Sequence, residues 1–373
     1  MNITREYLGG ITTSNTNLLN FLESIDKATI GIEVNPRTHM RGATAFWHLS
    51  PDLFEQHIFN INDLPLNKIL RRSKSLKDVE RSYRPIINLI KKVLKKETPD
   101  VILLNGTYYI PWMISIAAHE LDIPIVLRYA GVLSRETRWS SPRARKIFLA
   151  MERSFRKRVY SYIFPSQITE EVVRKEVYKT AVHKAYVIPN SVNIPSDIEI
   201  RPPVDRCIAI VGRDTSIKNF EAFFKIHKIL LRQKWKHEAT FVTKPGSMKN
   251  IPKTINIMAP MRPEGLYEFY MSQGLIIAPS HFETFGNVPM EAACLGVPVL
   301  VSDQMGCAEV LRLAGLDNMV MSFDDLNAVA ERVKKLCGQQ IMPHQLNNLR
   351  KKLNLRLINE KILAVLKEAA AKG

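Results

Sequence analysis

The chain has 373 residues, 46% apolar and 24% charged, with a formal net charge of +17. This length exceeds one ordinary hydrophobic core, so we expect two domains, and the composition excludes a disordered or fibrous protein. No apolar run reaches the roughly 18 residues of a transmembrane helix, and the first ten residues lack the apolar stretch of a signal peptide.

Short apolar runs alternate with amphipathic stretches through the N-terminal half. This alternation predicts a parallel sheet with crossover helices. The expected strands are 27–34, 99–106, 123–131 and 161–166. The expected helices are 79–97, interrupted near Pro85, 109–122, and a long basic helix at 143–160.

Residues 187–204 carry four prolines and are predicted to be a linker, after which the pattern restarts. Further strands are expected at 206–213, 237–244, 254–260, 274–280 and 298–303, and helices at 219–234, 263–273, 289–295 and near the C-terminus. The predicted domains are therefore 1–195 and 196–355, followed by a C-terminal helix at 356–373 that crosses back to the N-terminal domain.

The four cysteines are scattered and none forms a CxxC pair. We expect reduced, mostly buried thiols, no metal site, and a cytoplasmic location. Basic residues are concentrated between Lys68 and Lys96, with eleven against two acids, and between Arg135 and Arg158, with nine against two. Such charge suits nucleic acid, anionic lipid or a phosphorylated ligand, or forms a solvated face.

Ligands of open α/β sheets bind beyond the carboxyl ends of the strands, so residues just after strands are the candidates for a site. Glu283 lies in the loop that follows the expected strand 274–280. Pro289 suits a first helical turn and Gly296 a helix end, which places Glu291 in the first turn. A glutamate in that position most often complements the helix dipole, although the turn's free N–H groups also form an anion site.

Two other segments have the same relation to predicted strands. Gly212 ends an apolar strand, Arg213 follows it, and Lys218 precedes the next helix, so two cations could clamp a diphosphate. Each cation taken singly is equally explained as a surface residue. Gly9 and Gly10 precede an amphipathic helix and would let the backbone approach a ligand, or simply form a tight turn.

Four segments in this order resemble the retaining glycosyltransferases of the group 1, family-four type. They are the linker start VIPNSVN, the loop VGRDTSIKN, the helix and strand PEGLYEFYMSQGLIIAPS, and SHFETFGNVPMEAACLGVPV, which holds the E-x7-E pair. The resemblance implies a GT-B fold, which is an α/β architecture of two Rossmann-like domains facing across a cleft. It covers residues 160 to 310 well and the N-terminal half only in outline.

The resemblance also implies roles within a nucleotide-sugar site. Arg213 and Lys218 would bind the diphosphate, Glu283 would hold the sugar hydroxyls beside the reacting carbon, and Glu291 would hold the ribose. The base would rest near Met258 and Arg262. Sugar and phosphate would meet the amides of Thr284, Phe285, Gly286, Asn287 and Val288. The catalytic set would be Glu283, Arg213 and Lys218, with no cofactor and no metal, since the cations would stabilise the leaving diphosphate.

One departure concerns a histidine that many relatives carry after the fifth N-terminal strand. Ala130 takes that place, and Asn105 or His281 are the candidate substitutes, although either is better explained by a structural role. In the family's proposed front-face mechanism the leaving phosphate takes the acceptor's proton. A dedicated base is then not needed.

The first hypothesis for function is therefore a retaining, metal-independent hexosyltransferase in cell-surface glycan synthesis. The acceptor would be a saccharide or a lipid-linked hydroxyl, reached by reversible contact of basic residues with the anionic inner face of the membrane. The basic, amphipathic segment 86–96 could lie on such a surface or pack its apolar side on the sheet. The alternatives are a GT-B nucleotide-sugar epimerase and a basic nucleic-acid-binding protein, for which no zinc spacing or RNA-binding aromatic pattern is present.

Overall fold

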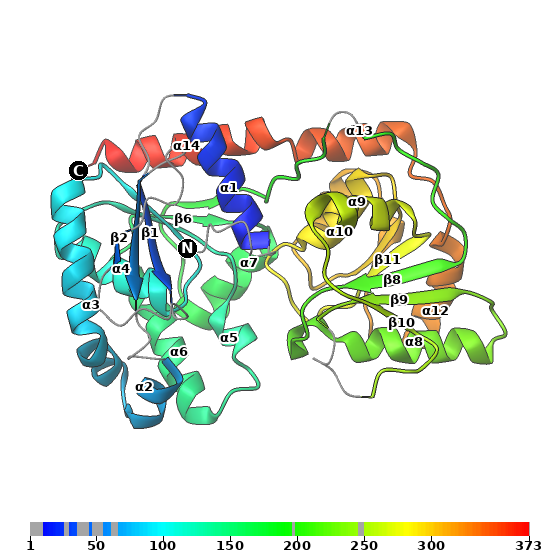
Figure 1. Cartoon of the computed structure of the whole chain (residues 1–373), viewed down its shortest axis with the longest axis horizontal. Helices are drawn as coiled ribbons and strands as arrows, with labels where there is room; N and C mark the ends of the chain where they lie inside the picture. Colours follow the sequence, from blue (N-terminus) through cyan, green and yellow to red (C-terminus); the bar gives the residue numbers. More distant parts are fainter. Residues whose placement is uncertain are drawn as a thin grey trace. The chain divides into compact units, whose positions relative to one another are not determined.

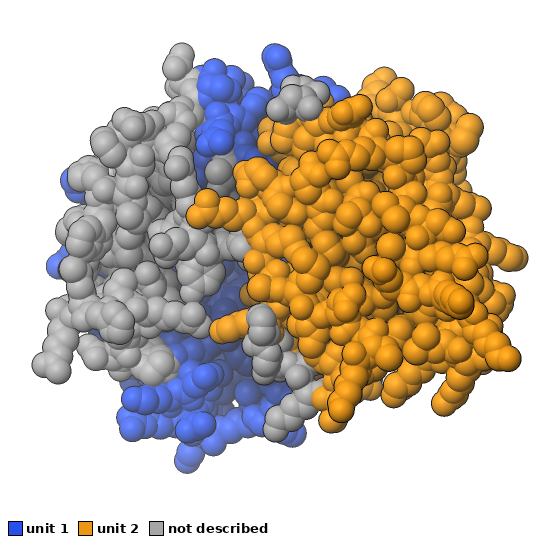
Figure 2. All heavy atoms as spheres, turned by 45° about the vertical axis from the view of Figure 1, so that its right-hand side comes forward, with its two compact units in different colours: residues 1–165, 169–188, 356–373 blue, residues 166–168, 189–355 orange. Residues whose placement is uncertain are grey.

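The chain divides into two compact units in a computed structural model (Figures 1 and 2). The structure describes residues 10–25, 30–35, 45–46, 55–60, 66–195, 198–244 and 250–372. Unit 1 comprises Met1–Pro165, Thr169–Ile188 and Arg356–Gly373, and unit 2 comprises Ser166–Ile168 and Pro189–Leu355. One division falls between Ile188 and Pro189, inside the proline-rich segment.

Unit 1 is built on a parallel sheet, as the alternating pattern predicted, with one further strand, β7, that the pattern did not indicate. Its four strands follow one another in the sheet as β4 (Ile102–Asn105), β5 (Ile125–Arg128), β6 (Ser161–Phe164) and β7 (Ala185–Val187). A smaller sheet pairs β1 (Ile30–Asn35) in parallel with β3 (Glu55–Asn60), and β3 with the antiparallel β2 (Ala45–Phe46). Of this smaller sheet the sequence pattern predicted β1 alone.

The helices of unit 1 cover the larger sheet (Figure 1). They are α1 (Gly10–Glu23), α2 (Leu66–Arg72), α3 (Leu76–Glu97), α4 (Tyr109–His119), α5 (Leu133–Glu136), α6 (Pro142–Ser154) with a 3₁₀ turn at Phe155–Lys157, α7 (Gln167–Val172) with a π-helical turn at Val173–Tyr178, and α14 (Leu355–Ala370). The long basic helix expected to reach residue 160 therefore ends earlier, at the 3₁₀ turn. There Phe155 is fully buried.

Helix α3 runs without interruption through Pro85, so the predicted break is wrong. A proline removes one helical hydrogen bond, but this helix is fixed at other points. Ser75 and Asp78 form a capping box at its start, and Tyr83, Ile87 and Ile90 are fully buried along one face. Burial of this face holds the helix on both sides of the proline. The apolar side of segment 86–96 thus packs inward and is not a membrane-facing surface.

The C-terminal helix α14 packs within unit 1. Its Ile358 and Ile362 are buried in one cluster with Val126 of β5 and Ile163 of β6. Further along the helix, the Lys184 ammonium bonds the carboxylate of Glu368 at 2.8 Å. The last residues of the chain therefore complete the core of the unit that contains the first ones.

Unit 2 contains a six-stranded, wholly parallel sheet. Its strand order is β10 (Asn256–Met258), β9 (Glu238–Val242), β8 (Cys207–Val211), β11 (Leu275–Ala278), β12 (Val299–Ser302) and β13 (Val320–Met321). Its helices are α8 (Phe220–Arg232), α9 (Pro263–Met271), α10 (Asn287–Cys294), α11 (Cys307–Leu313), α12 (Leu326–Leu336) and α13 (Pro343–Lys352). Strand order reverses between β8 and β11, so the carboxyl ends of these two strands mark a binding position.

Two features seen in the sequence have plain structural counterparts. All four cysteines are free, and Cys294, Cys307 and Cys337 are buried. No helix in the described part of the chain is both long and apolar enough to cross a bilayer. Residues 1–4, whose sequence MNIT also indicates a short strand, lie outside the described residues.

A chain of hydrogen bonds links two histidines in unit 2. His237 Nδ1 lies 2.8 Å from the Trp235 carbonyl, and its Nε2 lies 2.8 Å from His227 Nδ1. His227 Nε2 then lies 2.7 Å from Thr254 Oγ1. One assignment satisfies every contact: each Nδ1 carries the proton and the threonine hydroxyl donates to His227 Nε2. Burial lowers the pKa of both rings. For His227 the charges of His237 and Lys228 add to this effect and its pKa falls to about 4, whereas for His237 the hydrogen bond to the Trp235 carbonyl opposes it.

We predict that this chain makes the free energy of unfolding sensitive to acid. Below pH 6.5 the unfolded histidines take up protons that the folded chain excludes, so stability falls as the pH drops from 6.5 towards 4, by on the order of 2 kcal/mol. Denaturant unfolding at a series of pH values measures this slope. His227→Gln should flatten it, whereas the exposed His344→Gln should leave it unchanged. Equal slopes in wild type and His227→Gln would refute the assignment.

Candidate functional site

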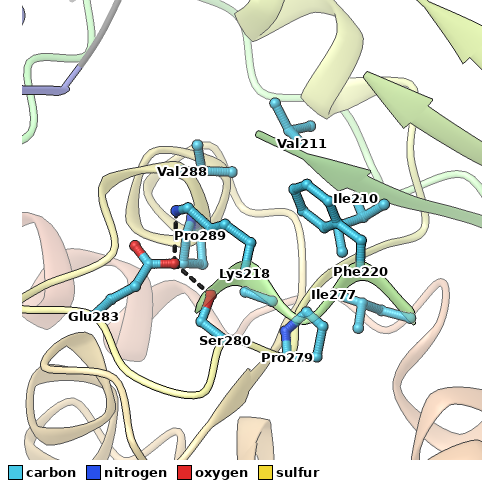
Figure 3. Close-up of a pocket in the computed structure, with 11 residues that line it drawn as sticks. Ile210, Val211, Lys218, Phe220, Ile277, Pro279, Ser280, Glu283, Val288 and Pro289 are labelled. Carbon is cyan, nitrogen blue, oxygen red and sulfur yellow. Dashed lines mark hydrogen bonds and ion pairs between the residues drawn. The ribbon is translucent and has the colours of Figure 1, made fainter. Parts of the chain in front are cut away.

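An ion pair joins the ends of β8 and β11 (Figure 3). Lys218 Nζ lies 2.7 Å from Glu283 Oε1, and the Ser280 hydroxyl donates to the same oxygen at 2.5 Å. Both charged side chains are partly covered, with exposed fractions of 26% for Lys218 and 17% for Glu283. A small pocket, partly open to solvent, lies beside them and is otherwise lined mainly by apolar residues.

Backbone contacts between two loops set the position of this pair. Lys218 ends a 3₁₀ turn, Ser216–Lys218, and Asn219 then adopts φ 52° before α8 begins. Asn219 Nδ2 donates to the Pro279 carbonyl at 3.1 Å, and the His281 N–H donates to the Ile217 carbonyl at 2.8 Å. The loop after β8 is therefore tied to the loop after β11. The separation of Lys218 and Glu283 is a consequence of the fold.

Gly212 directly follows β8, and its lack of a side chain matters for how α8 packs on the end of this strand. A Cβ atom built on it would lie 3.1 Å from the Phe220 ring. Phe220 opens α8 and is buried, and its ring lines the same pocket. The absence of a side chain at Gly212 thus lets α8 approach the strand end closely, which keeps Lys218 over the pocket.

The loop that carries Glu283 is held from its other side by the residues after β12. The Glu283 N–H donates to the Gln304 carbonyl at 3.3 Å, and its carbonyl accepts from Gly306 N–H at 3.0 Å. Gly286 has φ 110°, a conformation that favours glycine, and a Cβ there would lie 2.7 Å from Met305 Cε. The backbone of the whole loop is thus fixed before any ligand binds.

Helix α10 begins at Asn287, two residues earlier than predicted, because Gly286 supplies the left-handed N-cap. Glu291 consequently lies in the second turn, and its predicted position in the first turn is wrong. It is therefore too far along the helix to be a simple partner of the helix dipole. Instead the Tyr270 hydroxyl donates to Glu291 Oε2 at 3.2 Å, and burial raises the pKa of Glu291 to about 7.

The segment from Thr284 to Val288 leads into the start of α10. The N–H groups of Asn287 and Val288 belong to the first turn, where a helix provides no acceptor for them. Asn287 is anchored by its side chain, since its Oδ1 accepts from Asn190 Nδ2 at 2.8 Å. Phe285 is fully buried, so it contributes its backbone to the loop and its ring to the core.

The remaining candidates lie around this centre with less contact to it. Arg213 is exposed after β8, and it forms no ion pair among the described residues. Met258 ends the edge strand β10 with 40% of its surface exposed. Arg262 is the exposed N-cap residue of α9.

The glycine pair and the histidine substitutes have separate outcomes. Gly9 lies outside the described residues, and Gly10 is the first residue of α1. Asn105, at the end of β4, donates from its Nδ2 to Asn15 Oδ1 of α1 and so joins a strand to a helix within unit 1. Ala130 lies just after β5, and its methyl side chain cannot supply the imidazole that the family resemblance led us to expect there.

Ser280 and Tyr270 contact the two glutamates but were not singled out in the sequence. Ser280 ends the apolar run GLIIAPS, so its place at the carboxyl end of a strand was an available signal. Tyr270 lies on α9, far from Glu291 in the chain, and only the packing of α9 on α10 reveals it. Within the described ranges, no group of three or more His, Cys, Asp or Glu side chains could hold a metal ion.

Two protein-family models match consecutive parts of the chain. Residues 201–353 match the model described as glycosyl transferases group 1, and residues 51–195 match that of glycosyltransferase family 4. A capsular polysaccharide biosynthesis glycosyltransferase, CapM of Staphylococcus aureus, is 32% identical over 72 residues. That alignment covers 19% of each protein, so it spans a minor part of either.

Solved structures resemble the chain over nearly its whole length. A sucrose-phosphate synthase from Thermosynechococcus elongatus superposes with a TM-score of 0.74 at 16% identity, covering 98% of this chain and 94% of that one. A trehalose-6-phosphate protein from E. coli, bound with UDP-2-fluoro glucose, superposes with a TM-score of 0.68 at 11% identity, covering 98% of both chains. At such identities these matches show the fold, which is the GT-B fold expected from the sequence. With its two halves matched by the two models and its fold shared with these structures, the chain belongs to the group 1, family-four glycosyltransferases.

Proposed function

We propose that this glycosyltransferase moves a hexosyl group, with retention at the anomeric carbon, from a nucleotide-diphospho-sugar to a hydroxyl of a saccharide or lipid-linked acceptor. The observation that carries the proposal is the Lys218–Glu283–Ser280 cluster beside the first turn of α10. It places a cation, a carboxylate and free helix N–H groups at the strand ends where open α/β sheets bind ligands.

The ion pair explains how one cluster could serve two parts of the donor. A diphosphate carries more negative charge than one carboxylate, so it would compete with Glu283 for the Lys218 ammonium. Ser280 would still hold Glu283 Oε1, leaving the other carboxylate oxygen to accept from sugar hydroxyls. Lys218, Arg213 and the amides of Thr284–Val288 would stabilise the leaving diphosphate without a metal ion.

The second glutamate and the edge strand suit the nucleoside. Glu291 would accept hydrogen bonds from the ribose diol, and Tyr270 fixes the orientation of its carboxylate. Met258 and Ile257 present exposed apolar surface at the edge of the sheet, where a base could rest, with Arg262 nearby in sequence. The E. coli structure described above binds a UDP-sugar, and we infer that this chain uses a donor of the same chemical class.

The acceptor is inferred from the relatives and from charge. CapM takes part in capsular polysaccharide biosynthesis, and we propose a role for this chain in cell-surface glycan synthesis. Such a role would place the acceptor at the membrane surface, which the basic residues of unit 1 could contact reversibly through anionic lipids. The resulting protein would act at the inner face of the cell membrane.

Glu283→Gln should lower the turnover number for glycosyl transfer by about 100-fold or more, the scale for loss of one contact made in the transition state. Affinity for the nucleoside diphosphate should not fall and should rise slightly, because that ligand makes no sugar contact and would no longer compete with a carboxylate for Lys218. Steady-state kinetics and calorimetry measure the two quantities separately. The exposed Glu264→Gln on α9 is the control and should retain full activity. Full activity in Glu283→Gln would remove this residue from the site.

A panel of nucleoside diphosphates should raise the melting temperature, since a ligand that binds only the folded state stabilises it. The base that stabilises most identifies the donor.

Arg213→Ala and Lys218→Ala should each weaken binding of that diphosphate by about 1.5–3 kcal/mol, the value for a hydrogen bond to a charged group. Unchanged affinity in both variants, or activity that strictly requires magnesium, would contradict the proposed clamp.

Flotation with liposomes tests the proposed membrane contact. Binding should require acidic lipid and should disappear near about 1 M salt, where the Debye length falls to roughly 3 Å. Liposomes of neutral lipid are the control. If the protein ignores acidic liposomes even at low salt, the acceptor is not reached through anionic lipid.

A further inference from the structure

One end of unit 1 carries basic residues without intervening acids. It consists of residues 66–77, which are α2 and the start of α3, and residues 138–146, which lead into α6; we call these two segments the basic tip. Together they contain nine lysines and arginines and no aspartate or glutamate. All nine basic residues are exposed. The density of positive charge in these two segments is therefore higher than its average over the chain.

A hydrogen bond holds the two segments of the basic tip together. The Arg143 guanidinium donates from Nε to the Ser73 carbonyl at 2.8 Å, and Ser73 itself is buried. In Figure 1, α2 and the start of α6 lie at the same end of unit 1. The structure therefore merges two basic clusters that are about seventy residues apart in the sequence into one surface.

Among the described residues, no salt bridge joins any of these nine basic residues to a carboxylate. Asp78 follows residues 66–77 and is engaged in the cap of α3, where it accepts from the N–H groups of Lys74 and Ser75 at 2.9 Å. Glu136 precedes the second segment. The positive potential of the basic tip is thus left directed at solvent or at an acidic partner.

An aromatic side chain lies within the second segment. Trp139 has 51% of its surface exposed and lies between Arg138 and Ser140, just before the α6 N-cap Ser141. Tryptophan is a residue that membrane proteins place at the bilayer interface, where its apolar body and polar N–H both find partners. Nucleic-acid bases can also stack on such a ring, so the choice of lipid follows from the membrane contact of the proposed function.

We propose that the basic tip, together with Trp139, is the surface through which the protein docks on anionic lipid headgroups. This inference rests on the membrane contact of the proposed function and assigns that contact to particular residues. The other end of α3 is less suited, because its apolar face is buried and Lys91 is paired with Glu120 at 2.9 Å. The sequence indicated segment 86–96 as a surface that could lie on a membrane, whereas the structure favours the basic tip.

Two matched variants separate the ends of α3. The tip variant carries Arg71→Gln, Arg72→Gln and Lys74→Gln, and the control variant carries Lys92→Gln, Lys95→Gln and Lys96→Gln. Both lose three exposed charges. Each basic residue at an acidic bilayer accounts for about fivefold in binding, so the tip variant should bind vesicles of phosphatidylserine and phosphatidylcholine about 100-fold more weakly. The control variant should bind like wild type, and melting with nucleoside diphosphate should show both variants folded.

A second measurement tests whether the Trp139 ring enters the lipid bilayer. Lipids brominated on their chains should quench part of the tryptophan fluorescence of wild type, and this quenching should be lost in Trp139→Phe, which leaves the other three tryptophans in place. Retained quenching in Trp139→Phe would overturn the role given to this ring.

The outcomes distinguish this inference from the proposal beneath it. If wild type binds acidic vesicles but the control variant loses binding and the tip variant does not, the tip assignment is wrong and the membrane contact stands. If wild type binds no vesicles, the membrane contact itself fails, and the assignment with it. If a short DNA duplex binds the tip more tightly than vesicles do at about 0.15 M salt, the partner is nucleic acid and the assignment is overturned.

Discussion

The ion pair between Lys218 and Glu283 depends on the parallel sheet of unit 2. Parallel strands deliver their carboxyl ends to one edge, and the order β8–β11 makes the two loops neighbours although 65 residues separate the side chains. The His281–Ile217 backbone bond and the Asn219 contact with Pro279 then hold the loops together. Gly212 and Gly286 also keep these loops close, because a Cβ atom at either position would meet a neighbouring side chain. A change at any of these positions would alter the distance between the charged atoms.

Much of this arrangement was predictable because the chemistry is local. Apolar runs bounded by turns located the principal strands of the sheets, and strand–loop–helix order located Lys218 and Glu283 at one edge. The start of α10 was misplaced because Gly286, whose φ decides it, is indistinguishable in sequence from any loop glycine. The Ser280 contact was within reach of the same logic. The contact of Tyr270 with Glu291 was not, since it depends on how two helices pack.

The failure at Pro85 has a related cause. A proline in a helical pattern is expected to break the helix, and the local rule is sound for an exposed one. Helix α3 buries a continuous apolar face and is capped at its start, so tertiary packing outweighs the lost hydrogen bond. The small sheet of β1, β2 and β3 was largely missed because two of its strands lack strong apolar alternation. In α3 the burial that overrides the local preference of proline is a property of the whole unit.

The two glutamates of the E-x7-E pair lie in opposite electrostatic settings. Glu283 has a cation 2.7 Å away, whereas Glu291 is held by the neutral hydroxyl of Tyr270, and burial raises its pKa to about 7. Glu291 is therefore part protonated near neutrality in the free chain. In the proposed complex, two ribose hydroxyls donating to its carboxylate would favour the charged form and lower this pKa. Donor binding and proton release would then be coupled at Glu291, while Glu283 would exchange its cation for the sugar. Two identical residues in one motif would thus respond to the donor in different ways because their surroundings differ.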